Sequence, residues 1–168
     1  PSQLLEHWLE TPEVMKFLKN KNGEVLPESL KQKIHRARFF NQGFSTVEFL
    51  ASALVDMKLH LSKTDNIDPR RFEKETLAEI GMPDEIVMRH RIPHFGHLFS
   101  GEDYAAGYYS YLWSQVLDND AYEAFEETGN VYNPDLAEKL NEFIFSKGNT
   151  MDPAEAYRQF RGRDANVN

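Results

Sequence analysis

Two kinds of side chain that can do chemistry gather between residues 90 and 113. Three histidines with the spacing H-x3-H-x2-H come first, and four tyrosines follow within eight positions: His90, His94 and His97, then Tyr104, Tyr108, Tyr109 and Tyr111. Imidazoles can bind metal ions. Phenol and imidazole groups can also donate hydrogen bonds to an oxyanion that develops in a reaction. The stretch therefore raises two hypotheses, a metal site and a substrate-facing set of donors.

The spacing of the histidines does not predict a metal site. On one regular helix they would share a face, but Pro93 lies between His90 and His97 and disfavours helical backbone at Ile92. We expect a helix to restart at "IPHF" instead. The sequence has no cysteine, and no histidine is followed by glutamate, so the His-Glu-x-x-His signature of zinc hydrolases is absent. We predict no metal ligand within this chain.

The tyrosines leave two interpretations open. On a helix, Tyr104, Tyr108 and Tyr111 fall on one stripe, where they are either packing aromatics or phenols that face a substrate. Gly107 costs a helix about 1 kcal/mol relative to alanine, which indicates a close approach by another backbone or a ligand. On the same helix we expect Tyr109 and Trp113, together with Val116, in the core.

Recurring helix starts predict an all-α fold. Three Asp-Pro or Asn-Pro pairs each put a capping side chain before a proline that fits the first helical position: Asp68-Pro69, Asn133-Pro134 and Asp152-Pro153. We expect helices over 2–20 with a break near Pro12, and over 27–39, 44–61, 69–80, 83–90, 103–127, 134–146 and 153–161. Strand signals are nearly absent and no internal repeat is visible, so we expect a single helical region over residues 1–168.

Composition excludes several classes of protein. The 168 residues are 40% hydrophobic, enough for a packed core, and carry a formal charge of −8 without a basic stripe, which argues against nucleic-acid binding. No segment approaches the run of about 18 apolar residues that a membrane helix needs. The lack of cysteine fits a reducing compartment, and we predict a cytoplasmic protein. No nucleotide-binding glycine motif or G-x-S-x-G elbow occurs either.

Four blocks of sequence occur in an order that identifies a family. They are "PSQLLEHW" at 1–8, "FNQGF" at 40–44, "GHLFSGEDYAAGYYSYLWSQV" at 96–116 and "RQFRGRD" at 158–164. With these blocks the chain resembles, over essentially its whole length, the zinc oligopeptidases of the thimet oligopeptidase, oligopeptidase A and bacterial peptidyl-dipeptidase family. The resemblance implies the multi-helix C-terminal part of a zincin-type metallopeptidase that hydrolyses short peptides.

The resemblance also implies where the zinc lies. In the family, two histidines of the His-Glu-x-x-His helix bind the metal together with a glutamate two residues before a Pro-Ser-Gln block, which is Pro1, Ser2 and Gln3 here. These ligands and the general-base glutamate are therefore expected upstream of Pro1, in the missing N-terminal half of the same protein. Zinc is expected in the full-length enzyme, and this fragment alone is expected to bind none and to be inactive.

The peptide-binding residues of the family can be carried over one by one. His97 matches the histidine before a flexible glycine-rich loop and is expected to contact the substrate backbone. Gly101, in that loop, is expected to bind substrate as well. Tyr104 and Tyr111 match tyrosines that donate hydrogen bonds to the oxyanion or the substrate, and Tyr108 is expected to line the groove.

Two further questions stay open. Glu6 follows the missing zinc ligand by about two helical turns, so it either hydrogen-bonds that ligand or is an ordinary carboxylate on a helix face. The chain itself is either part of an enzyme, or a non-catalytic helical module that binds peptides in the same groove, or a structural domain. A face built to pack on a missing half would be left uncovered, so we expect exposed apolar surface and self-association of the fragment.

Overall fold

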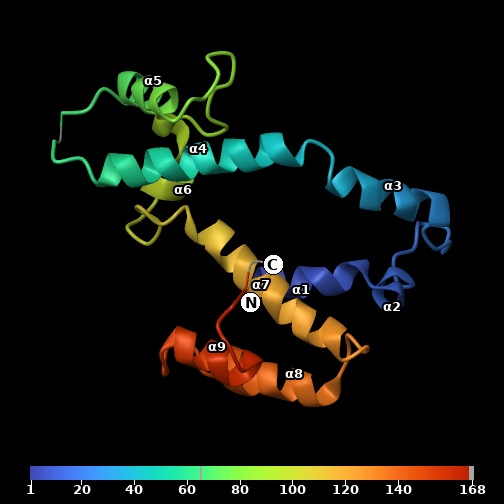
Figure 1. The fold of residues 1–168 in the computed structure, drawn as a ribbon. Coiled ribbons are helices and arrows are strands. Elements are labelled where there is room, and N and C mark those ends of the chain that lie inside the picture. Colours follow the sequence, from blue (N-terminus) through green and yellow to red (C-terminus); the bar gives the residue numbers. More distant parts are fainter. Residues whose placement is uncertain (65, 167–168) are drawn as a thin grey trace. The chain divides into compact units, whose positions relative to one another are not determined.

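The computed structural model of the chain describes residues 1–64 and 66–166, and their regular structure is helical (Figure 1). Within these ranges the one element of β-type pairing is an isolated antiparallel bridge between Lys19 and Val25. The predicted all-α fold class is therefore confirmed. The chain divides into two compact units, a first unit of Pro1–Glu28 with Leu112–Asn168 and a second unit of Ser29–Tyr111. The single helical region expected over 1–168 stays a prediction.

In its described residues the second unit is built from four helices and one 3-10 turn. In chain order they are α3 (Glu28–Arg38), whose first residue belongs to the first unit, α4 (Gln42–His60), α5 (Pro69–Glu79), the 3-10 turn η2 (Ile92–His94) and the short helix α6 (Gly96–Phe99). The unit ends two residues into α7 (Ser110–Glu127). These bounds confirm the helices expected over 27–39, 44–61 and 69–80, and η2 lies at the expected "IPHF" restart.

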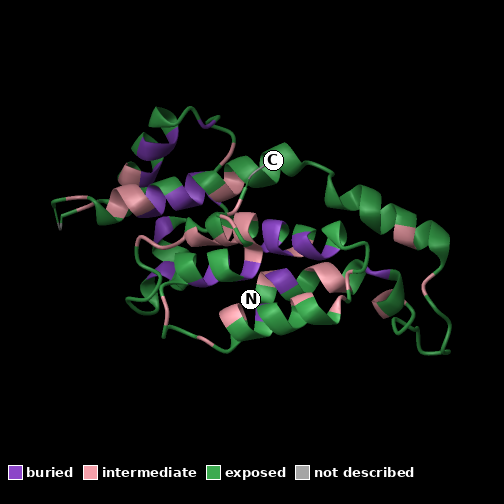
Figure 2. Ribbon diagram, turned by 60° about the horizontal axis from the view of Figure 1, so that its bottom comes forward, coloured by how far each residue is buried: buried purple, intermediate pink, exposed green. Residues whose placement is uncertain are grey.

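A single apolar cluster holds the second unit together. Side chains from α4 and α5 meet the segment that runs from the end of α5 into α6: Ala51, Val55, Leu77, Met82, Met88, Ile92, Phe95 and Leu98. The buried positions of α4 are confined to one part of the helix, between Ala51 and Asp56 (Figure 2). That part of α4 thus forms the surface against which η2 and α6 pack.

The first unit combines short N-terminal elements with the long α7. The former are α1 (Ser2–Glu6), the 3-10 turn η1 (His7–Glu10) and α2 (Pro12–Met15); α8 (Pro134–Leu140), the π-helical turn η3 (Asn141–Phe145) and α9 (Pro153–Arg161) follow α7. The break expected near Pro12 is confirmed, with Thr11 capping α2. The core of this unit consists of Leu4, Ala121, Ala124, Phe125, Leu140, Tyr157 and Phe160.

The predicted Asp-Pro and Asn-Pro caps are confirmed at all three places. The side chain of Asp68 accepts hydrogen bonds from the backbone N–H groups of Arg70 and Arg71. Asn133 and Asp152 accept one such bond each at the starts of α8 and α9, and in all three helices proline follows the cap. Each cap satisfies backbone donors that the first helical turn leaves without a partner.

Three expected helical ranges differ from the structure. The helices expected over 2–20 end at Met15, and residues 16–20 form a turn and the isolated bridge at Lys19. Residues 83–90 form turns and irregular backbone instead of a short helix. Gly81, with φ of 76°, ends α5 in a left-handed conformation, and Met82 and Met88 then turn into the core. The long helix expected over 103–127 begins only at Ser110. The backbone at Ala106 is left-handed, with φ of 56°, and a right-handed helix cannot continue through it.

Large apolar side chains remain exposed in both units, as expected. Helix α3 has no buried residue, and Phe44, Val47 and Leu54 of α4 are each nearly half exposed. No helix within the described part of the chain is long and apolar enough to cross a membrane.

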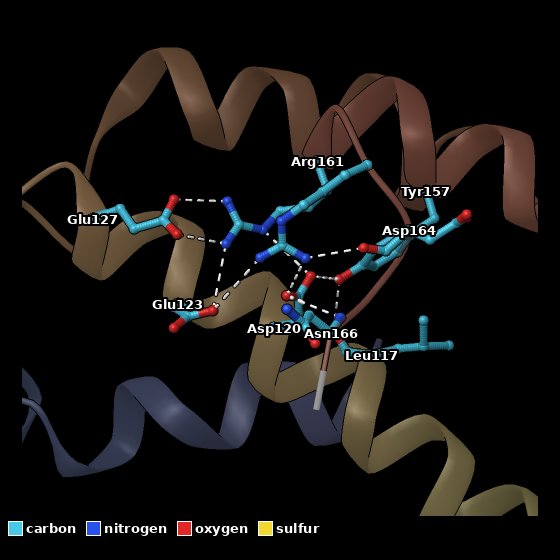
Figure 3. A network of polar contacts seen from close by, with 9 residues as sticks. Leu117, Asp120, Glu123, Glu127, Tyr157, Arg161, Asp164 and Asn166 are labelled. Atoms are coloured by element: carbon cyan, nitrogen blue, oxygen red, sulfur yellow. Dashed lines mark hydrogen bonds and ion pairs between the residues drawn. The ribbon is translucent and has the colours of Figure 1, made fainter. Parts of the chain in front are cut away.

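A polar network ties α9 to α7 in the first unit (Figure 3). The fully buried carboxylate of Asp120 on α7 accepts hydrogen bonds from the Tyr157 hydroxyl at 2.5 Å and from Arg161 Nε at 3.3 Å, and pairs with Arg163 at 2.6 Å. Arg161 also makes two bonds of 2.7 Å to Glu127. Burial by itself would raise the pKa of Asp120, but the donors around it outweigh burial and hold that pKa below its usual range.

The Asp120 network predicts a pH-dependent stability difference. Because the folded pKa of Asp120 is depressed, its contribution is present above its ordinary pKa of about 4 and is lost as the pH falls through the folded value. Asp120→Asn should lower the unfolding free energy by about 2 kcal/mol at pH 7. In denaturant titrations from pH 7 to about 2, this difference should narrow below about pH 4. Asp135→Asn, at an exposed position of α8, serves as control; a pH-independent gap for Asp120→Asn would contradict the assignment.

Candidate functional site

One histidine and three tyrosines meet in the second unit. The His97 Nε2 atom on α6 lies 2.7 Å from the hydroxyl oxygen of Tyr111 at the start of α7. The His97 ring lies 4.4 Å from the Tyr104 ring and 5.8 Å from the Tyr108 ring, measured between centroids. Tyr108 and Tyr111 contact each other edge to face at 5.5 Å. The four residues that were singled out from the sequence therefore form one cluster.

An open pocket of about 610 Å³ borders this cluster. It is lined by Phe49, His90, His94, Phe95, Gly96, His97, Tyr108 and Tyr111. Tyr108 is the central aromatic: its ring stacks on Phe49 at 5.1 Å and meets Phe95 edge to face at 4.9 Å. The pocket thus joins an aromatic wall to imidazole and phenol groups, a combination that suits a ligand with both apolar and hydrogen-bonding parts.

The tyrosines converge for a reason other than the one expected. Tyr104 and Tyr108 do not share a helical stripe with Tyr111, because residues 104–109 form a turn before α7. The N–H of Gly107 donates to the carbonyl oxygen of Tyr104 at 2.9 Å. A Cβ at Gly107 would lie 3.2 Å from that same oxygen, so the close approach expected at this glycine comes from the backbone of its own turn.

The expectation for Tyr109 and Trp113 is wrong. Their side chains are 50% and 67% exposed, and neither belongs to a core cluster. The expectation rested on a helix that continued through residues 104–109. Without that helix, the register that placed Tyr109 opposite the substrate stripe does not apply.

The segment that carries His97 is held from α5. Glu73, whose side chain is 1% exposed, accepts a hydrogen bond from Arg91 Nε at 2.7 Å and one from the backbone N–H of Ile92 at 3.1 Å. These bonds fix the backbone where η2 begins. Pro93 then opens η2, and Phe95 and Leu98 bury themselves in the core on either side of His97.

The Tyr111 phenol stays protonated at neutral pH. Burial, followed by the nearby Tyr104 and Tyr108, raises the pKa of Tyr111 above its ordinary value. A protonated phenol can donate a hydrogen bond, and it can also accept one from His97 Nε2–H. If His97 donates to the Tyr111 oxygen, the phenol hydrogen can be donated to Tyr104 or to a ligand in the pocket.

Five residues of the pocket lining were not predicted as site residues: Phe49, His90, His94, Phe95 and Gly96. His90 and His94 line the pocket although the family resemblance assigns them no role, and their spacing with His97 was the available signal. Phe49 gave no signal beyond its place in a helix. Among the described residues, no group of three or more histidine, cysteine, aspartate or glutamate side chains could hold a metal ion. A zinc ion therefore finds no ligand set within the described ranges.

The other predicted site residues, Tyr104, Gly101 and Glu6, are not among the residues that line the pocket. Gly101 lies in the exposed loop between α6 and the turn of residues 104–109, which we call the tyrosine turn. Glu6 is exposed at the end of α1, in the first unit. The substrate-binding role of Gly101 and the zinc-supporting role of Glu6 stay predictions.

Comparison with known proteins extends over the whole chain. The model of the family "Peptidase family M3" matches residues 1–168. The chain is 38% identical to dipeptidyl carboxypeptidase of Escherichia coli (strain K12) over 168 residues, which is 97% of this chain and 24% of that protein. It is 36% identical to oligopeptidase A of the same strain over 170 residues, 98% of this chain and 24% of that protein.

A plant relative matches at lower identity. The probable cytosolic oligopeptidase A of Arabidopsis thaliana is 31% identical over 175 residues, which cover 98% of this chain and 24% of the relative. The chain thus spans about a quarter of the length of the curated relatives that it matches.

The burial of Glu73 predicts a stability difference between two similar ion pairs on α5. Glu73 and Glu75 each contact an arginine Nε at 2.7 Å, but their side chains are 1% and 63% exposed. Glu73→Gln should lower the unfolding free energy by about 2 kcal/mol, because a buried acceptor loses its charge and faces Arg91 and a backbone donor. Glu75→Gln should change it by less than about 0.5 kcal/mol. Equal effects of the two substitutions in urea titrations would contradict the role of Glu73.

Proposed function

Since the chain belongs to peptidase family M3, we propose that the protein containing it hydrolyses short peptides, and that the pocket of the second unit binds the peptide. The observation that carries the proposal is the contact of His97 with Tyr111 and Tyr104 beside that pocket. Relatives named dipeptidyl carboxypeptidase and oligopeptidase A support peptides as the substrate class.

In this proposal the phenols of Tyr104 and Tyr111 donate hydrogen bonds to the oxygen of the carbonyl group that is attacked. Hydrolysis of a peptide bond passes through a tetrahedral intermediate whose oxygen carries negative charge. A phenol with a raised pKa is still protonated when that charge develops, which suits Tyr111. Tyr104 is 45% exposed, which suits a residue that meets a substrate. His97 orients Tyr111 and contacts the substrate backbone.

Tyr108 and Gly101 have supporting roles. The Tyr108 ring, packed between Phe49 and Phe95, forms an apolar wall for a substrate side chain. Gly101 lies in the loop that leads to Tyr104, and we propose that its backbone contacts the bound peptide. Glu6 would act elsewhere, through a hydrogen bond to a zinc ligand of the complete enzyme.

Zinc belongs to this proposal only through the complete enzyme. Family membership implies a zinc ion there, and no ligand set for it exists within the described residues. We therefore assign its ligands, including those of the His-Glu-x-x-His signature, to the part of the protein outside these 168 residues. By itself the chain is expected to be inactive.

The rest of the protein is the main partner that we propose. The exposed apolar side chains of α4 support a covering partner, because contiguous apolar surface is seldom left in water. Made alone, the chain should cover this surface by self-association. A cytoplasmic location is proposed as well, and the name of the cytosolic plant relative supports it.

Chelation should abolish peptide cleavage by the complete protein. A short peptide with a fluorophore and a quencher reports cleavage, which is measured before and after a zinc chelator and again after added zinc. We expect loss and recovery of the signal, because metal-assisted hydrolysis requires the ion. Cleavage that the chelator does not change would overturn the role of zinc in the proposal. No cleavage of any such peptide would overturn the proposal as a whole and favour a non-catalytic peptide-binding module.

Removal of the Tyr111 hydroxyl should act on turnover. In the complete protein, Tyr111→Phe should lower kcat by about 100-fold or more and change KM by less than about threefold, because the hydroxyl acts mainly in the transition state. Tyr109→Phe is the matched control. It also removes a phenolic hydroxyl, but from an exposed side chain that does not line the pocket. An unchanged kcat in Tyr111→Phe would make Tyr111 a packing residue.

A further inference from the structure

Asp56 is a buried carboxylate that the proposed reaction does not use. Its side chain is 1% exposed and lies on α4 between the buried core residue Val55 and the partly buried Leu59. A carboxylate in such a place is unfavourable unless its oxygens are hydrogen-bonded. What Asp56 binds therefore determines why it is there.

The carboxylate of Asp56 binds the backbone of the tyrosine turn. Its Oδ1 accepts a hydrogen bond from the N–H of Ala106 at 3.0 Å, and its Oδ2 accepts one from the N–H of Tyr108 at 2.9 Å. The two oxygens thus hold two alternate N–H groups of one short segment. Hydrogen bonds to a charged acceptor in a buried place are the strong ones, so this contact is a firm anchor.

His60 completes the anchor from the same helix. Its Nδ1 lies 2.8 Å from Asp56 Oδ1 and 2.9 Å from the main-chain oxygen of Asp56. Both neighbours are acceptors, so Nδ1 carries a hydrogen. The His60 ring also stacks on Phe99, two residues after His97, at 6.1 Å. The Asp56–His60 pair, which holds the tyrosine turn through Asp56, therefore also contacts through His60 the helix that carries His97.

The anchor explains the unusual backbone at Ala106. A non-glycine residue with φ of 56° is in the left-handed region, which is unfavourable and persists only where the surroundings enforce it. Two N–H groups that would otherwise enter a helix instead donate to Asp56, so α7 begins only at Ser110. The same turn brings Tyr104 to the His97 ring and Tyr108 to the pocket wall.

We propose that Asp56 is a positioning residue: by binding the N–H groups of Ala106 and Tyr108, it holds Tyr104 and Tyr108 against His97 in the geometry that the peptide needs. The proposal rests on the proposed function for its effect on catalysis. Its structural part, that Asp56 holds the turn, does not depend on that function.

Kinetics of the complete protein test the proposal first. Asp56→Asn keeps the shape of the side chain, but its amide leaves one acceptor and turns an NH₂ group towards a backbone donor. We expect kcat to fall by about 100-fold with KM changed less than about threefold, because a misplaced donor acts mainly on the transition state.

Asp68→Ala is the matched control. Asp68 also lies in the second unit and also accepts two backbone N–H groups, those of Arg70 and Arg71, but it does not line the pocket. Its loss should destabilise the protein and leave kcat within about twofold of the wild type. An equal loss of kcat in the two variants would overturn the proposal, since general destabilisation would then account for it.

A double-mutant cycle shows whether Asp56 acts through Tyr104. If it does, Asp56→Asn should lower kcat by less than about threefold once Tyr104→Phe is already present, because the hydroxyl that it positions is gone. Effects that multiply in full would overturn the proposal. A Tyr104→Phe variant with normal kcat would count against the proposed function of Tyr104 and also against this inference.

Hydrogen exchange gives a readout that is independent of activity. In Asp56→Asn the amides of Ala106 and Tyr108 should exchange at least about tenfold faster than in the wild type, while Asp68→Ala leaves them unchanged. Unchanged exchange would overturn the inference whatever the activity. If the wild type shows no chelator-sensitive cleavage, the proposed function fails, and the exchange of these two amides alone decides whether Asp56 holds the turn.

Discussion

Buried carboxylates of the second unit have to be satisfied by backbone donors, and the pocket depends on this requirement. Asp56 on α4 and Glu73 on α5 are both almost fully removed from solvent. Asp56 accepts two backbone N–H groups of the tyrosine turn, and Glu73 accepts the backbone N–H of Ile92 at the start of η2. An ionised group in an apolar interior is tolerated only with such partners. The two helices thereby determine the shape of segments that could not define their own.

This arrangement separates the stable part of the unit from the part that binds. The apolar cluster consists of residues from α4, α5 and the segment that follows them, and among the tyrosines it is Tyr108 that packs against it. The pocket residues Tyr111 and His97 interact with each other through a hydrogen bond and a tilted ring contact. Loops on a rigid scaffold commonly carry binding residues for this reason.

Local sequence signals predicted the helices well. Asp68, Asn133 and Asp152 act on backbone groups two or three residues away, so the caps and the helix starts could be read from neighbouring letters. The all-helical class followed from those caps. The start of α7 could not be read in this way, because it depends on Asp56, which lies far away in the sequence. Periodicity alone extended the helix through a turn that a distant carboxylate enforces.

The candidate site shows the same division between local and distant causes. Family blocks led to His97, Tyr104, Tyr108 and Tyr111, and the structure brings these four together, but through a turn and not through a helical stripe. The error for Tyr109 and Trp113 has that same origin. Asp56 did leave a signal: it is the one acidic residue in the largely apolar stretch from Phe49 to Leu59 of α4. Its meaning depended on which backbone came to meet it, and no pattern in α4 contains that information.

The left-handed backbone at Ala106 also restricts which residues can replace alanine at this position. Glycine fits that conformation without strain, and asparagine and aspartate tolerate it, whereas valine, isoleucine and threonine strongly oppose it. Position 106 should therefore vary within a narrow set of residues in chains that keep this turn, although the methyl group of alanine is not among the atoms proposed to touch a substrate. Selection for peptide binding would then constrain residue 106, although its side chain takes no part in the reaction.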